Sequence, residues 1–205
     1  SLPEDEASEP RSTPELLDIV PRGNRRVYDM RAVLDVVFDD RGWFEVQPKF
    51  GPAIICALAH LGGQPVAVVA NQPKVLAGSI DADAADKAAN FITVADSFHL
   101  PIVFLADNPG MLPGSRSEKS GVLRSGARMF AAQTAATTLK LHVTLRKAYG
   151  FGSMVMSLLG FDNQANRSSA GEEPGNQLAG FDGRLDLSAL LPGVALYGQA
   201  IGEDE

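Results

Sequence analysis

The chain has 205 residues, 45% of them hydrophobic and 21% charged, which suits one globular domain with a sizeable core. Its formal net charge of −7 argues against nucleic acid as a partner, because binding to a phosphate backbone requires positive charge. One cysteine excludes an internal disulfide and a cysteine-rich zinc site, and no apolar run reaches the roughly 18 residues of a membrane span. No signal peptide is visible, so we expect a cytoplasmic protein that is not bound to a membrane.

The first 27 residues are polar and contain four prolines, which predicts a linker or arm. One short helix is expected there in STPELLDIV, with Ser12 or Thr13 as its cap and Pro14 at its first position. A single domain is expected over residues 28–164. Residues 165–205 look like an atypical tail, partly loop or disordered, because NRSSAGEEPGNQLAGFDGR is rich in small and polar residues. A final strand and turn are predicted in LDLSALLPGVALYGQAIG.

The central region predicts alternating strands and helices. A short helix over 30–39 and a strand within 43–51 are followed by two strands within 53–73 that the GGQP turn joins, both apolar enough to be covered on both faces. A helix over 81–99, a strand over 101–110, a helix over 120–137, a strand over 140–150 and a helix over 152–160 complete the pattern. Two successive strand–glycine turn–helix units predict an α/β fold with parallel pairing. Ligands of such sheets bind at the carboxyl ends of the strands, where both glycine turns fall.

The side chains offer little for nucleophilic or metal chemistry. None of the three histidines, His60, His99 and His142, stands beside a serine in a nucleophile-elbow pattern, so structural roles are expected. Cys56 lies in an apolar run and is expected to be a buried, inert thiol.

One carboxylate cluster, DADAAD, is interpreted as a helix start rather than a metal site. Asp81 or Asp83 would cap that helix and complement its dipole, and no metal is predicted. GSRSEKSG lacks the glycine spacing of a phosphate-binding loop.

The backbone of the glycine turns could itself carry chemistry. N–H groups at the start of a helix can stabilise an oxyanion that forms on a carbonyl group, without help from a side chain. The alternative is that the glycines only permit tight turns. Residue pattern alone leaves both readings open.

Several stretches in order carry a resemblance to a known family: LLDIVPRGNRRVYDMRAVLD, WFEVQPKFG, VAVVANQPKVLAGSIDADAADKAANFI, DSFHLPIVFLADNPGMLPGSRSEKSGVLRSGARM and LRKAYGFGSMVM. Over about residues 16–164 the chain resembles the C-terminal half of the carboxyltransferase (beta) subunit of biotin-dependent acyl-CoA carboxylases, such as propionyl-CoA and acetyl-CoA carboxylase. The resemblance implies a crotonase-like (ClpP/crotonase) fold, a single-domain spiral of ββα units. After Gln164 the agreement with the family is largely lost.

The resemblance also implies a reaction and its partners. Carboxylate would move from carboxybiotin, borne on a carrier protein or biotin carboxylase subunit, to the α-carbon of a short-chain acyl-CoA such as acetyl-CoA or propionyl-CoA. Relatives hold the two developing oxyanions with two pairs of backbone amides, one in each half of the carboxyltransferase. An N-terminal half, in the same or another chain, and a homo-oligomer are therefore expected.

Site residues follow by position from the same resemblance. The biotin-side oxyanion hole maps to the N–H groups of Phe151 and Gly152, where many relatives have Gly-Gly-Ala in place of Gly150-Phe151-Gly152. The resemblance places Met154 at the acyl pocket. Further residues of the biotin cleft would be Asn108, Pro109, Gly110, Met111, Gly114, Tyr149 and Gly150.

The sequence also leaves other functions open. A non-catalytic assembly or interaction domain could keep the fold, and a decarboxylase of malonyl-type CoA esters would run part of the same chemistry. Hydration is disfavoured because the turns offer no base, with Glu118 as the remaining candidate. Arg146 and Lys147 are expected to be a solvated pair at a strand end, with anion binding as the alternative.

Overall fold

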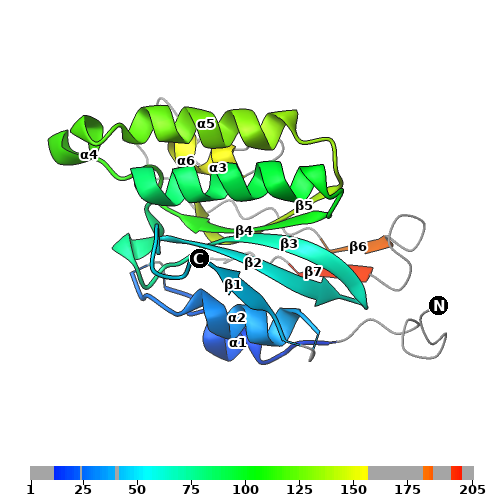
Figure 1. The fold of residues 1–205 in the computed structure, drawn as a ribbon. Helices are drawn as coiled ribbons and strands as arrows, with labels where there is room; N and C mark the ends of the chain where they lie inside the picture. Colours follow the sequence, from blue (N-terminus) through cyan, green and yellow to red (C-terminus); the bar gives the residue numbers. More distant parts are fainter. Residues whose placement is uncertain (1–11, 24, 40–41, 157–181, 187–194, 200–205) are drawn as a thin grey trace.

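The computed structural model describes residues 12–23, 25–39 and 42–156, together with the backbone of two strands at 182–186 and 195–199. Five strands form the main sheet in the order β1-β2-β3-β4-β5 (Figure 1). They are β1 (Phe44–Val46), β2 (Ile54–Leu61), β3 (Gln64–Asn71), β4 (Ile102–Asn108) and β5 (Lys140–Ala148). The first three strands are antiparallel neighbours, and β3, β4 and β5 run parallel. The predicted α/β class and parallel pairing are confirmed.

Helices cover both faces of the sheet. On one face lie α3 (Ala82–Ser97) and α5 (Val122–Ala135), and on the other lie α1 (Leu16–Ile19) and α2 (Met30–Val37) (Figure 1). The short helices α4 (Ser115–Lys119) and α6 (Gly150–Met156) precede α5 and follow β5, and η1 (Leu76–Gly78) is a single 3₁₀ turn after β3. The sequence pattern did not indicate α4 or η1.

Strand residues alternate between two apolar cores. Cys56, Val69 and Phe104 face α3 and α5, while their neighbours Ile55 and Val68 face α2. Strands β2, β3 and β4 therefore bury residues on both faces, which the continuous apolar runs predicted for β2 and β3, whereas β1 and β5 are only partly buried. The thiol of Cys56 is fully buried, and this burial raises its pKa to about 12.

The ends of several elements differ from prediction. Helix α1 begins at Leu16, and its N-cap residue Glu15 makes no side-chain capping bond, so the expected cap at Ser12 or Thr13 is wrong. The predicted strand within 43–51 ends at Val46, because the chain turns out of the extended conformation at Gln47. The Asp81 carboxylate does cap α3, accepting a hydrogen bond of 2.9 Å from the N–H of Ala84.

The predicted tail lies mostly outside the described residues, including the glycine- and serine-rich stretch from 166 to 181. Two strands are described there, β6 (Asp182–Asp186) and β7 (Ala195–Gln199), which pair antiparallel with each other. One strand and a turn had been expected. Among the described residues, no helix is long and apolar enough to cross a lipid bilayer.

Candidate functional site

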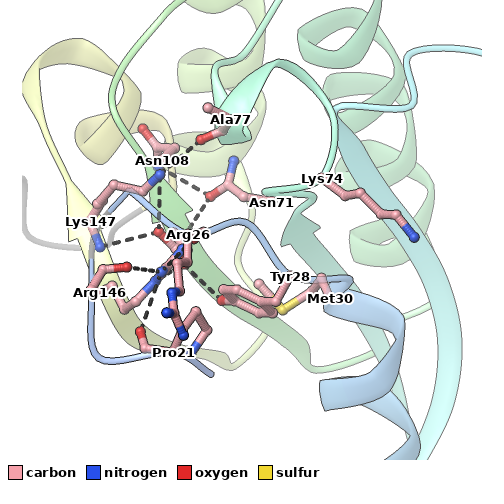
Figure 2. A network of polar contacts seen from close by, with 12 residues as sticks. Pro21, Arg26, Tyr28, Met30, Asn71, Lys74, Ala77, Asn108, Arg146 and Lys147 are labelled. Atoms are coloured by element: carbon pink, nitrogen blue, oxygen red, sulfur yellow. Dashed lines mark hydrogen bonds and ion pairs between the residues drawn. The ribbon is translucent and has the colours of Figure 1, made fainter. Parts of the chain in front are cut away.

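The carboxyl ends of β3, β4 and β5 come together around a buried cluster of polar side chains (Figure 2). Strand β3 ends in Asn71, β4 ends in Asp107 and Asn108, and β5 brings Arg146 and Lys147 beside them. This is the edge of the sheet where the two glycine turns begin. The cluster and the turns together form the candidate site.

Asp107 is the charged centre of the cluster. Its side chain is fully buried, and Oδ2 accepts hydrogen bonds from the Tyr28 hydroxyl at 2.8 Å and from Nε of Arg146 at 2.7 Å. Nζ of Lys147 lies 3.7 Å from Oδ1. Burial, followed by the nearby charge of Asp107, raises the pKa of Tyr28. Burial lowers the pKa of Lys147, which Asp107 partly opposes.

Arg146 ties the segment before α2 to the sheet. Its Nη1 donates to the carbonyl oxygens of Pro21, Gly23 and Arg26 at 3.3, 2.9 and 2.9 Å, and its guanidinium lies 4.8 Å from the centre of the Tyr28 ring. These contacts satisfy Nε and Nη1, whereas Nη2 is buried without a hydrogen-bond partner among the described residues.

The expectation that Arg146 and Lys147 form a solvated pair is therefore wrong. Their side chains are only 5% and 8% exposed. Asp107 provides the physical reason, because a buried carboxylate at the end of β4 attracts cations from the neighbouring end of β5. Parallel pairing of the two predicted strands, each ending in charged residues, was the signal that could have found this cluster.

Lys147 also holds the turn η1. Its Nζ donates to the carbonyl of Ala77 at 2.9 Å. Leu76, Ala77 and Gly78 all have positive φ, at 50, 53 and 87°. Gly78 is required here, because a side chain at this position would overlap the carbonyl oxygen of Asp107. The conformation of η1 is thus fixed by the same cluster.

The loop after β4 is held by side chains from two strands. Oδ1 of Asn71 accepts from the N–H of Asp107 and from Nδ2 of Asn108, both at 3.1 Å. Oδ1 of Asn108 then accepts from the N–H of Gly110 at 3.0 Å, and the Gly110 carbonyl accepts from the N–H of Ile80 at 3.1 Å. Hydrogen bonds from β3, from Asn108 and from Ile80 therefore hold the loop after β4.

The second turn packs directly on this loop. The N–H of Tyr149 donates to the carbonyl of Asn108 at 3.3 Å, and Gly150 has a positive φ of 55°. Gly152 is buried, and a Cβ on it would lie 2.6 Å from Cα of Gly110. Among the described residues, no acceptor pairs with the N–H groups of Phe151 and Gly152. They are the free donors that the first turn of a helix leaves.

The structure places most of the predicted residues on two adjacent segments. Asn108, Gly110, Met111, Tyr149, Gly150, Phe151 and Gly152 lie on the loop after β4 and the first turn of α6. Pro109 is exposed on that loop, Gly114 is exposed before α4, and Met154 is 39% exposed on α6.

The described residues offer no metal site and no evident base. Among them, no three or more histidine, cysteine or carboxylate side chains gather where they could hold a metal ion. Glu118, the remaining candidate for a base, is exposed on α4.

Comparison with known proteins gives one consistent result. The sequence model of the carboxyl transferase domain matches residues 1–174. The chain is 45% identical over 142 residues to the uncharacterized carboxylase YngE of Bacillus subtilis, which covers 69% of this chain and 28% of that protein. It is 44% identical over 142 residues to the biotin-dependent long chain acyl-coenzyme A carboxylase beta4 subunit of Mycobacterium tuberculosis, covering 69% of this chain and 27% of that protein.

A solved relative shares the fold. The crystal structure of transcarboxylase 12S, described as a hexamer assembly with hydrolyzed methylmalonyl-coenzyme A bound, matches with a TM-score of 0.68 and 43% identity over 69% of this chain and 28% of that chain. The chain thus spans less than a third of the length of these relatives. The matching segment belongs to their C-terminal half.

Proposed function

The chain belongs to the carboxyl transferase domain family and has its crotonase-like fold, and from this membership we propose that it forms the C-terminal part of the carboxyltransferase of a biotin-dependent acyl-CoA carboxylase. The observation that carries the proposal is the pair of amides of Phe151 and Gly152, which have no acceptor among the described residues and lie on a turn packed against the loop after β4. Such donors suit a reaction in which charge moves onto a carbonyl oxygen.

The residues present fit biotin as the carboxyl carrier. Bound carboxybiotin would supply the carboxyl group, and its ureido ring would supply the carbonyl oxygen on which charge develops. The amides of Phe151 and Gly152 are the donors that could hold such an oxygen, and the loop containing Asn108, Gly110 and Met111 would form the adjacent wall.

Each part of the site has a distinct task in this proposal. The amides of Phe151 and Gly152 stabilise negative charge as it develops, and each donor of this kind is worth roughly 3 kcal/mol of barrier. Asn71 and Asn108 keep the loop in place, so no reorganisation is needed when charge appears.

The acyl-CoA would be short, with Met154 beside its acyl group. Met154 presents an apolar, 39% exposed side chain three residues after Phe151. The relatives act on different acyl groups, judging from names that include propionyl-CoA carboxylase beta chain and long chain acyl-coenzyme A carboxylase. The resemblance to propionyl-CoA and acetyl-CoA carboxylases makes propionyl-CoA and acetyl-CoA the substrates to test first.

The site would be completed by partners. An N-terminal carboxyltransferase half would provide the second pair of amides and the rest of the CoA site, and a biotinylated carrier or biotin carboxylase subunit would deliver the carboxyl group. A homo-oligomer is part of the proposal, supported by the hexamer of the 12S relative. The proposal also places the chain in the cytoplasm, which cell fractionation would test.

A malonyl-type CoA decarboxylase is the second candidate. The observation that favours it is 41% identity over 146 residues to the methylmalonyl-CoA decarboxylase subunit alpha of Veillonella parvula. Hydration has no such support, because the described turns contain no positioned base.

The experiment measures CO₂ release from malonyl-CoA and from methylmalonyl-CoA. Each substrate is tested with and without free biotin, first with this chain alone and then with a related N-terminal half added. We expect biotin-dependent release that requires both halves. Release without biotin would favour the decarboxylase, and no release from folded, assembled protein would leave an assembly role.

Two variants of Phe151 separate the contribution of its backbone N–H group from that of its ring. Phe151→Pro and Phe151→Ala both remove the ring, but only the first removes the N–H, and proline is tolerated in the first turn of a helix. We expect Phe151→Pro to be slower than Phe151→Ala by about 10²-fold. Equal rates would contradict a role for this N–H group.

A further inference from the structure

The Phe151 side chain leaves the turn and packs against α5. Its ring lies 6.1 Å from the ring of Phe130, centre to centre, with an angle of 52° between the planes. This tilted arrangement is favourable for aromatic pairs. The ring thus connects the start of α6 to the middle of a long helix in the core layer.

Gly126 makes room for this contact. A Cβ at Gly126 would lie 3.0 Å from Cε1 of Phe151 and 2.8 Å from Cε of Met111. Both side chains therefore occupy the space that the missing side chain leaves on α5. We call Gly126, Phe130, Met111 and the Phe151 ring the ring socket.

Met111 brings the loop after β4 into the socket. Its backbone forms a parallel bridge with Ile80, and its side chain packs on the same core as Phe130 and Phe151. The socket therefore joins the loop, α5 and α6 at one point.

The turn needs such an anchor because of its sequence. Gly150 and Gly152 flank Phe151, and glycine allows many backbone orientations. Fixing the ring of Phe151 fixes its Cα–Cβ bond, and with it the peptide units on either side. We propose that Phe151 is a positioning residue whose ring, held in the socket at Gly126, aims its own N–H and that of Gly152 at the carbonyl oxygen of the ligand. This inference rests on the carboxyltransferase function proposed above.

The test combines a spectroscopic signal with a rate. The full 205-residue chain, labelled with ¹³C at the methionine methyl groups, reports the socket through the signal of Met111. We expect the ring current of Phe151 to shift this signal, Phe151→Ala to abolish the shift and Gly126→Ala to alter it. Free biotin should move the Met111 signal in the unsubstituted chain. Ala131→Ser, on the exposed part of α5, is the matched control and should leave the signal unchanged.

Rates of biotin-dependent decarboxylation are then measured in the assembled enzyme, normalised to the folded fraction. We expect Phe151→Ala to lower the rate about tenfold or more, since small misplacements of catalytic groups have large effects. Phe151→Leu should recover part of the loss. Gly126→Ala should lower the rate about threefold, and should have no further effect in the Phe151→Ala background, because its effect passes through the ring.

The outcomes separate this inference from the proposed function. An inactive unsubstituted enzyme overturns the proposed function and this inference with it. An active enzyme in which Gly126→Ala acts equally in both backgrounds, or in which Phe151→Ala keeps the full rate, overturns the positioning role alone.

Discussion

The guanidinium of Arg146 and the carboxylate of Asp107 meet at 2.7 Å, with the two side chains 5% and 0% exposed. Lys147 adds a second cation 3.7 Å from the other carboxylate oxygen. In a buried group of this kind each charge depends on its partners, because water cannot replace a lost contact.

Removal of the negative charge should therefore be costly. We expect Asp107→Asn to lower the free energy of unfolding by about 3–5 kcal/mol, because two cations stay buried without their counter-charge. Urea unfolding followed by circular dichroism measures the loss. Asp86→Asn is the matched control: Asp86 pairs with the exposed Arg128, and its loss should cost under about 1 kcal/mol. Similar losses for both substitutions would contradict the strength assigned to the buried cluster.

A methyl group at Gly78 should destabilise the chain around the buried cluster of Asp107. Gly78→Ala forces an alanine into φ 87°, which costs about 1–2 kcal/mol, and it also drives Cβ against the Asp107 carbonyl. We expect a total loss above about 2 kcal/mol in thermal or urea unfolding. Gly23→Ala, where a Cβ meets nothing within 4 Å, should change stability little. Unchanged stability of Gly78→Ala would show that η1 adapts.

Met154 should affect substrate choice more than stability. Because its side chain is 39% exposed, Met154→Ala should change the unfolding free energy by less than about 0.5 kcal/mol. The larger pocket should shift kcat/KM toward longer acyl-CoA esters by about tenfold, as expected for small changes of an apolar pocket. Leu123→Ala, an exposed residue of α5, controls for loss of surface. If Met154→Ala and Leu123→Ala show the same preference among acyl-CoA esters, Met154 does not line the acyl pocket.

Burial of Cys56 should make the stability of the folded chain depend on pH in the alkaline range. The thiol ionises near 9.0 when unfolded, and burial raises its pKa to about 12 in the folded chain. Above pH 9 the unfolded state releases its proton first, so this contribution to stability is full below pH 9 and is lost as the pH rises toward 12. Cys56→Ala should flatten the fall in unfolding free energy between these values. Equal slopes would mean that the thiol ionises alike in both states.

Burial also bears on the reactivity of the thiol. We expect a thiol reagent at pH 8 to label Cys56 only as fast as the chain opens, since the thiolate is the reactive form. Rapid labelling of the folded chain would contradict the buried position.

The strand and helix pattern could be predicted because it depends on local spacing. The apolar runs of β2, β3 and β4 and the alanine-rich α3 each signal their own conformation. The ends of α1 and β1 are less predictable, because Glu15 makes no side-chain capping bond and Gln47 adopts a positive φ that its residue type rarely adopts.

The candidate site also has one part that could be predicted from the sequence and one part that could not. Resemblance to the family located the turn at Phe151 and the loop at Asn108, and the structure places them in contact. The ion pair of Asp107 with Arg146 joins residues 39 apart in the chain, and sequence reading assigned Arg146 to solvent. Only the pairing of β4 with β5 brings them together.

The polar cluster also joins parts of the chain that are far apart in sequence, and this has a kinetic consequence. Tyr28 and Asp107 are 79 residues apart, and Arg146 contacts Pro21 across 125 residues. Contacts of such separation close large loops and tend to form late in folding, after the local β2–β3 hairpin. The cluster would then be absent from the transition state, and its loss would speed unfolding while leaving the folding rate nearly unchanged. Comparing folding and unfolding rates of Asp107→Asn with those of the unsubstituted chain would measure this partition.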